Sequence, residues 1–186
     1  ARFGKELIDH NIFAICGDGD LMEGVSYEAA SIAGHHKLDN LVVIYDDNKI
    51  TIDGTTELSF SDNVADRFRA QNWNVIEAGE ISEDLDAIEA AINEAKVNTG
   101  SPTIIVMQTQ CGFPSPKFTN SHKAHGNPFD ADEIKATKEE MGHSTDSFSI
   151  DEDVYAFYKG AVSHQSEKLF DHALNAASLV KEGNEK

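Results

Sequence analysis

Short, continuous apolar runs recur along the chain and predict the strands of a sheet. Four such runs cover residues 12–16, 41–45, 73–76 and 102–107, and the run at 73–76 is the weakest. The runs are continuous rather than alternating, which is typical of strands buried on both faces of a parallel sheet. We therefore expect a parallel sheet with little solvent contact on either face.

Apolar residues at helical spacing fill the segments between these runs. The first stripe consists of Val25, Ala29, Ile32, Ala33 and His36. A second contains Val64 and Phe68, with Ser61 or Asp62 as the expected N-cap. A third consists of Leu85, Ile88, Ala91, Ile92 and Ala95. The alternation of strands and helices predicts an α/β fold, a parallel sheet flanked by helices with right-handed crossovers.

The character of the sequence changes after the last apolar run. Residues 111–129 contain three prolines, two glycines and no acidic residue, which predicts a loop. Helices with acidic outer faces are expected after it, over residues 130–140, 151–162 and 165–181, with a polar tail or linker start at 181–186. The length of 186 residues and the 40% apolar content suit one sizeable core, so a single domain is expected over residues 1–186.

Charge and cysteine content narrow the range of partners. The formal net charge is −18, so we expect the chain to bind neither nucleic acid nor an anionic membrane. A bound phosphate would need a metal, a helix N-terminus or a local basic island. Cys16 and Cys111 follow no disulfide pattern, which favours a reducing, cytoplasmic location. Residues 1–5 are typical of a helix end, which predicts a fragment or a chain without its first residues.

Polar residues follow directly after the first two apolar runs. Gly17-Asp18-Gly19-Asp20 follows the first run, and Asp46-Asp47-Asn48 follows the second. In a parallel sheet both segments lie at the carboxyl edge, where open α/β sheets bind ligands. The intervening helix presents its N-terminus, with free backbone N–H groups, to the same edge. The arrangement therefore favours an anionic ligand.

Asp18 and Asn48 offer a carboxylate and an amide oxygen, which are hard ligands suited to Mg²⁺ or Ca²⁺. Either segment alone is an ordinary turn, because Gly, Asp and Asn are common turn residues. Two such segments, each after a buried strand and separated by one helix, favour a metal that bridges the protein and a diphosphate.

These segments resemble the thiamine diphosphate fingerprint, in which Gly-Asp-Gly is followed at a distance by Asn. Four segments are similar to the transketolase family in particular: residues 17–24, 28–35, 45–54 and 125–129. The last reads His-Gly-Asn-Pro-Phe, with Phe129 where the family usually has Leu. The resemblance extends over most of residues 1–160. It implies the diphosphate-binding fold of that family, with this chain as the second part of the domain and 111–129 as an active-site loop.

The resemblance also implies roles for individual residues. Asp18 and Asn48 would bind the metal through their side chains, and Ile50 through its carbonyl oxygen. Gly19 would contact the diphosphate through its backbone. Glu23 would lie at a subunit interface and couple to the partner's cofactor-activating glutamate.

His125 would reach both the diphosphate and the substrate, and is the expected catalytic residue of this chain. His122, three residues earlier, is expected to be a solvated loop residue. No third ligand at a suitable spacing accompanies the two histidines, so zinc is not expected.

In the family this site performs ketol transfer in the pentose phosphate pathway, from a ketose phosphate to an aldose phosphate. The cofactors implied are thiamine diphosphate and Mg²⁺ or Ca²⁺. A pyrimidine-binding domain or subunit would complete the site, and the complete enzyme would be a homodimer. Two alternatives stay open: a dihydroxyacetone synthase or deoxyxylulose-phosphate synthase, and a non-catalytic module that binds metal diphosphate or a subunit.

Overall fold

The computed structural model describes residues 9–98, 100–162, 170, 171 and 174. Residues 10–143 form one compact unit, and the described residues from 144 onward belong to a second. In the second unit residues 152–162 are helical, as expected, whereas most of the expected helix at 165–181 and the tail at 181–186 lie outside the described residues. Compactness does not test whether the two units fold as one domain, so the single-domain assignment over residues 1–186 stays a prediction.

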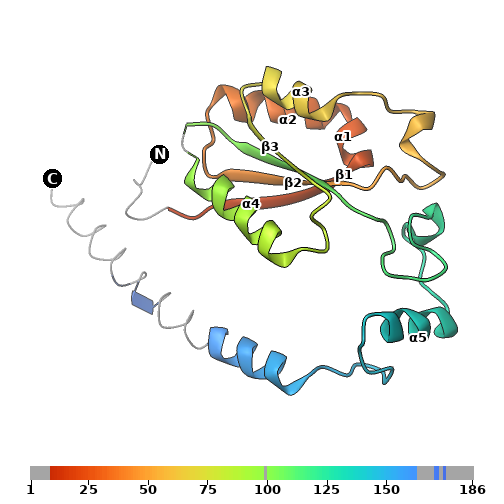
Figure 1. Ribbon diagram of the computed structural model, residues 1–186. Helices are drawn as coiled ribbons and strands as arrows, with labels where there is room; N and C mark the ends of the chain where they lie inside the picture. Colours follow the sequence, from red (N-terminus) through yellow and green to blue (C-terminus); the bar gives the residue numbers. More distant parts are fainter. Residues whose placement is uncertain (1–8, 99, 163–169, 172–173, 175–186) are drawn as a thin grey trace. The chain divides into compact units, whose positions relative to one another are not determined.

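Four parallel strands form the sheet of residues 10–143, as predicted (Figure 1). They are β1 (Ile12–Gly17), β2 (Leu41–Asp47), β3 (Asn74–Gly79) and β4 (Thr103–Gln108). Their spatial order is β1-β2-β4-β3. Gly17 pairs with Asp46, and Asp46 with Met107. The carboxyl ends of the strands therefore lie together at one edge.

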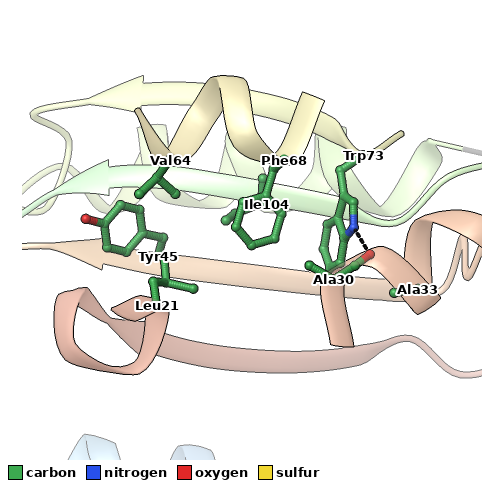
Figure 2. Packing of buried hydrophobic residues seen from close by; sticks show 8 residues of the cluster. All are labelled: Leu21, Ala30, Ala33, Tyr45, Val64, Phe68, Trp73 and Ile104. Atoms are coloured by element: carbon green, nitrogen blue, oxygen red, sulfur yellow. Dashed lines mark hydrogen bonds between the residues drawn. The ribbon is translucent and has the colours of Figure 1, made fainter. Parts of the chain in front are cut away.

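Helices cover the two faces of this sheet. One face packs on α1 (Asp18–Met22), α2 (Gly24–His35) and α3 (Val64–Ala70). Figure 2 shows this core, in which Tyr45 and Ile104 of the sheet meet Phe68 and Trp73. The other face packs on α4 (Leu85–Val97) through Val42, Ile105, Ala91 and Ala95. Short 3₁₀ helices η1 (Thr56–Leu58) and η2 (His122–Ala124) and helix α5 (Ala131–Glu140) complete the unit.

The predicted apolar stripe of α2 is wrong for most of its residues, since only Ala33 of the stripe is buried. Val25 and Ile32 are 69% and 59% exposed, and the buried residues of α2 are Ala30, Ala33 and Gly34. Contacts with residues far along the chain determine which face of α2 is buried. For example, the Trp73 indole N–H donates to the Ala30 carbonyl at 2.8 Å. The small residues on this face let the helix pack closely against the backbone at Gln71.

Three other expectations need correction. Strand β1 is not buried on both faces, since Phe13 and Ile15 are 46% and 77% exposed. The N-cap of α3 is neither Ser61 nor Asp62 but Asn63, whose side chain accepts from the Asp66 N–H. The single helix expected after β1 is divided into α1 and α2 by an extended residue at position 23.

No helix among the described residues is long and apolar enough to span a membrane.

Candidate functional site

Asp18 begins α1 directly at the carboxyl end of β1 and is 2% exposed. Two donors hold its carboxylate. The Tyr45 hydroxyl lies 2.7 Å from Oδ1, and the Lys49 backbone N–H donates to Oδ2 at 3.0 Å. Because Lys49 directly follows Asn48, the structure brings the two predicted segments together at one edge of the sheet. A carboxylate oxygen has further lone pairs, so both bonds leave acceptor capacity for a cation.

A second buried carboxylate shares the same tyrosine. The Asp47 side chain is 6% exposed, and its Oδ1 lies 2.8 Å from the Tyr45 hydroxyl and 2.6 Å from the Lys49 ammonium. Burial raises the pKa of Asp18, and the negative charge of Asp47 adds to this, while the bonds from Tyr45 and Lys49 oppose it. Burial together with the two carboxylates also raises the pKa of Tyr45. The charged form of Asp18 is therefore costly without a cation.

Asn48 and Ile50 lie in the turn that follows β2. The Asn48 Oδ1 accepts the Ile50 N–H at 2.9 Å, and its Nδ2 donates to Asp46 at 3.0 Å. The latter contact fixes which side of the amide carries the oxygen. Along the described part of the chain, hydrogen bonds of this turn end on the carbonyl oxygens of Lys49 and Gly54, and none is donated to that of Ile50.

A groove of about 590 Å³ opens beside this turn, at the carboxyl ends of β2, β3 and β4. Asn48 and Ile50 line it, together with Gln108 at the end of β4 and the loop residues Ser82, Thr109, Gln110 and Asn120. Its charged lining residues are Asp47, Glu80, Glu83 and Lys49, and the lysine is already paired with Asp47. An anion would meet a net negative lining here, so a diphosphate would need a cation with it.

The residues present fit a divalent metal and a diphosphate. Asp18, Asn48 and Ile50 offer a carboxylate, an amide and a carbonyl oxygen, all hard donors. No group of three or more His, Cys, Asp or Glu side chains suited to a metal occurs among the described residues. A metal held by one carboxylate keeps positions for phosphate oxygens and water. Gly19 is exposed, and a Cβ built there would meet nothing within 4 Å, so the chain itself leaves this space open.

Glu23 and His125 stand apart from these contacts. Glu23 is exposed between α1 and α2, where its carbonyl accepts from the Ser26 hydroxyl at 2.7 Å. His125 is exposed and ends η2, with its N–H donating to the His122 carbonyl at 3.0 Å. No hydrogen bond or ion pair among the described residues joins the His125 side chain to the Asp18–Asn48 edge. Their expected roles stay predictions.

The loop over residues 111–129 is built around a buried acid that sequence reasoning missed. Glu133 of α5 is 6% exposed and accepts from the Ser115 hydroxyl and from the Lys117 N–H. Phe118 stacks on Phe129 with centroids 5.4 Å apart, so the departure from the family's Leu has a packing partner. The loop is therefore anchored to α5. The sequence distinguished residues 111–129 by their prolines, their glycines and their lack of acidic residues, and did not indicate that an acid of the following helix would be buried against them.

Sequence reasoning also missed Tyr45, Asp46 and Asp47 as the partners of the expected ligands. Asp46 and Asp47 directly follow the apolar run at 41–45, and Tyr45 is its last residue. Nothing in the run indicated that the Tyr45 hydroxyl would bind a carboxylate. Cys16 lies next to Gly17, and burial raises its pKa to about 12, with Asp20 contributing. The thiol is therefore protonated near neutral pH and supplies no nucleophile to the site.

Comparison with known proteins places this chain in a family. Residues 1–183 match the family model described as "Transketolase, thiamine diphosphate binding domain". A probable transketolase of Streptococcus pneumoniae serotype 4 is 44% identical over 185 residues, which is 98% of this chain and 28% of that protein. The chain thus spans between a quarter and a third of the length of this relative.

Solved structures agree with the sequence match. The transketolase of Campylobacter jejuni has a TM-score of 0.88 at 38% identity, covering 93% of this chain and 27% of its own. A structure of Pichia stipitis transketolase in complex with sedoheptulose 7-phosphate also scores 0.88 at 38% identity, covering 94% of this chain and 26% of its own.

Proposed function

The chain belongs to the family of transketolase thiamine diphosphate-binding domains, and from this membership we propose that it supplies the metal and diphosphate half-site of a transketolase. The reaction is the transfer of a two-carbon ketol unit from a ketose phosphate to an aldose phosphate. Mg²⁺ or Ca²⁺ accompanies the cofactor. A pyrimidine-binding domain or subunit completes the site, in a homodimer located in the cytoplasm. We call the chain together with that second half the assembled enzyme.

One observation carries the proposal: Asp18 and the turn at 48–50 meet at one sheet edge, beside a groove whose lining is acidic. Asp18, Asn48 and Ile50 would hold the metal, and the Gly19 backbone would contact the diphosphate. Glu23 would face the partner subunit. The sugar phosphate in the Pichia stipitis complex supports the substrate class. The bound cofactor supplies the carbanion stabilisation that the protein cannot.

The first test concerns sufficiency. We expect the 186-residue chain alone to show no turnover of xylulose 5-phosphate with ribose 5-phosphate, because it holds only half of the cofactor site. The assembled enzyme should turn over these sugars, and should stop when thiamine diphosphate or the divalent metal is removed. Turnover is followed by a coupled assay for glyceraldehyde 3-phosphate. Activity of the chain alone would refute the half-site assignment. Turnover by the assembled enzyme without a divalent metal would refute the proposed metal requirement.

A second prediction concerns His125. An imidazole N–H can donate to a diphosphate or to a developing alkoxide, where a donor matters most. We expect His125→Ala to lower kcat of the assembled enzyme by about 10²-fold. Stability should change little, because an exposed loop histidine leaves no cavity.

His122→Ala is the matched control, since His122 is also exposed and lies three residues earlier. Its kcat should equal that of the wild type. A loss with His122→Ala and none with His125→Ala would show that the assignment within the loop is reversed. Two silent variants would leave the loop without a catalytic role.

A further inference from the structure

Asp18 is held by a buried hydroxyl that has no assigned role. Resting on the proposed function, we propose that Tyr45 is a positioning residue, whose hydroxyl fixes the Asp18 carboxylate in the orientation that binds the metal. Tyr45 is 2% exposed and packs beside Leu21 and Val64 at one end of the core, with its hydroxyl pointing out of the apolar cluster (Figure 2). Its ring therefore cannot turn away, and its hydroxyl has a fixed place.

The contacts define how the hydroxyl acts. Tyr45 Oη lies 2.7 Å from Asp18 Oδ1 and 2.8 Å from Asp47 Oδ1. A phenol has one proton, so at any instant it donates to one of the two carboxylates. Asp47 has a second partner in the Lys49 ammonium at 2.6 Å. Asp18 has no such cation among the contacts of the described residues. The hydrogen bond from Tyr45 therefore stabilises the charged Asp18 carboxylate more than it stabilises that of Asp47.

Each oxygen of the Asp18 carboxylate has its own donor, and the two donors come from different parts of the fold. Tyr45 holds Oδ1 from the core, and the Lys49 N–H holds Oδ2 from the turn that carries Asn48. Together they fix the plane of the carboxylate, so the lone pairs left free point in a constant direction. Residues that orient a metal ligand in this way are commonly worth about 10- to 100-fold in metal affinity. The hydroxyl is thus expected to act on metal affinity and not only on packing.

The experiment measures Mn²⁺ binding to the assembled enzyme with saturating thiamine diphosphate, from the electron paramagnetic resonance signal of free Mn²⁺. Tyr45→Phe removes one oxygen and keeps the buried ring. We expect it to raise the Mn²⁺ Kd by about 10- to 100-fold. Tyr27→Phe is the matched control, because it also removes a hydroxyl that donates to an aspartate, Asp62, and neither residue is a hydrogen-bond partner of Asp18. Its Kd should be that of the wild type.

The outcomes separate this inference from the proposed function. If Asp18→Asn abolishes Mn²⁺ binding while Tyr45→Phe keeps the wild-type Kd, the positioning role is overturned and the metal site stands. If Asp18→Asn binds Mn²⁺ like the wild type, the metal site and the inference both fail. A purely structural tyrosine would lower the unfolding temperature and leave Kd unchanged. Should Tyr45→Phe fail to fold, the double variant Tyr45→Phe with Asp47→Asn is measured in its place with the same expectation, because Asp47→Asn removes the charge of the second buried carboxylate that loses the tyrosine hydroxyl.

Discussion

Replacing Asp18 with asparagine is expected to lower kcat for ketol transfer by about 10³-fold or more in the assembled enzyme, a loss of about 4 kcal/mol. Asp18 is the one carboxylate in the proposed metal set, and its side chain is buried at the sheet edge. An asparagine there could accept from only one of the two donors, the Tyr45 hydroxyl and the Lys49 N–H, and would turn its own N–H₂ group toward the other. The rate is measured with saturating thiamine diphosphate and Mg²⁺.

Asp20→Asn is the control for the loss of one negative charge in the same short helix. Asp20 is exposed, and its side chain accepts from the Gly17 N–H at 2.9 Å, a bond that an amide oxygen can also accept. We expect its kcat to be close to that of the wild type. Equal losses in the two variants would assign the effect to net charge and remove Asp18 from the metal set.

Gly34→Ala is expected to destabilise the fold by about 3 kcal/mol or more, beyond the usual cost of overpacking. A Cβ at this position would lie 1.8 Å from the Gln71 carbonyl oxygen and 3.0 Å from its carbon. The obstacle is backbone, which cannot rotate away, so α2 would have to move off the loop before β3. That shift would also strain the Trp73–Ala30 hydrogen bond. The free energy of unfolding is measured by urea titration of the assembled enzyme.

Gly24→Ala is the matched control, because Gly24 lies in the same helix and a Cβ there would meet nothing within 4 Å. It should leave stability unchanged or raise it by up to about 1 kcal/mol, since alanine loses less entropy in a helix. If Gly34→Ala were as stable as Gly24→Ala, the close approach of α2 to Gln71 would be wrong.

The main elements of the fold could be read from local pattern. All four apolar runs became strands, and the stripes at Val64–Phe68 and Leu85–Ala95 became α3 and α4. These elements depend on spacing within ten or so residues, which is the range that periodicity measures. The placement of Asp18 and Asn48 at one edge followed as well, because every strand in a parallel sheet ends on the same side.

The details that position the site were beyond local pattern. The strand order β1-β2-β4-β3 is made by backbone hydrogen bonds. Nearly every residue offers the same backbone donor and acceptor, so local pattern does not specify which strands pair. The buried face of α2 is set by contacts with Trp73 and Gln71, some forty residues away along the chain. The helix therefore buries its small residues and not the more apolar stripe visible in its own sequence.

By itself the sequence determined the α/β class, the parallel sheet, the family and the two segments at its carboxyl edge, since each rests on residue type and short spacing. Tertiary structure alone decided that Tyr45 would reach both Asp18 and Asp47, and that Glu133 would anchor the loop over residues 111–129. A buried polar group is costly unless it finds a partner, and that partner can lie anywhere in the chain. Only the packed fold specifies which one it is.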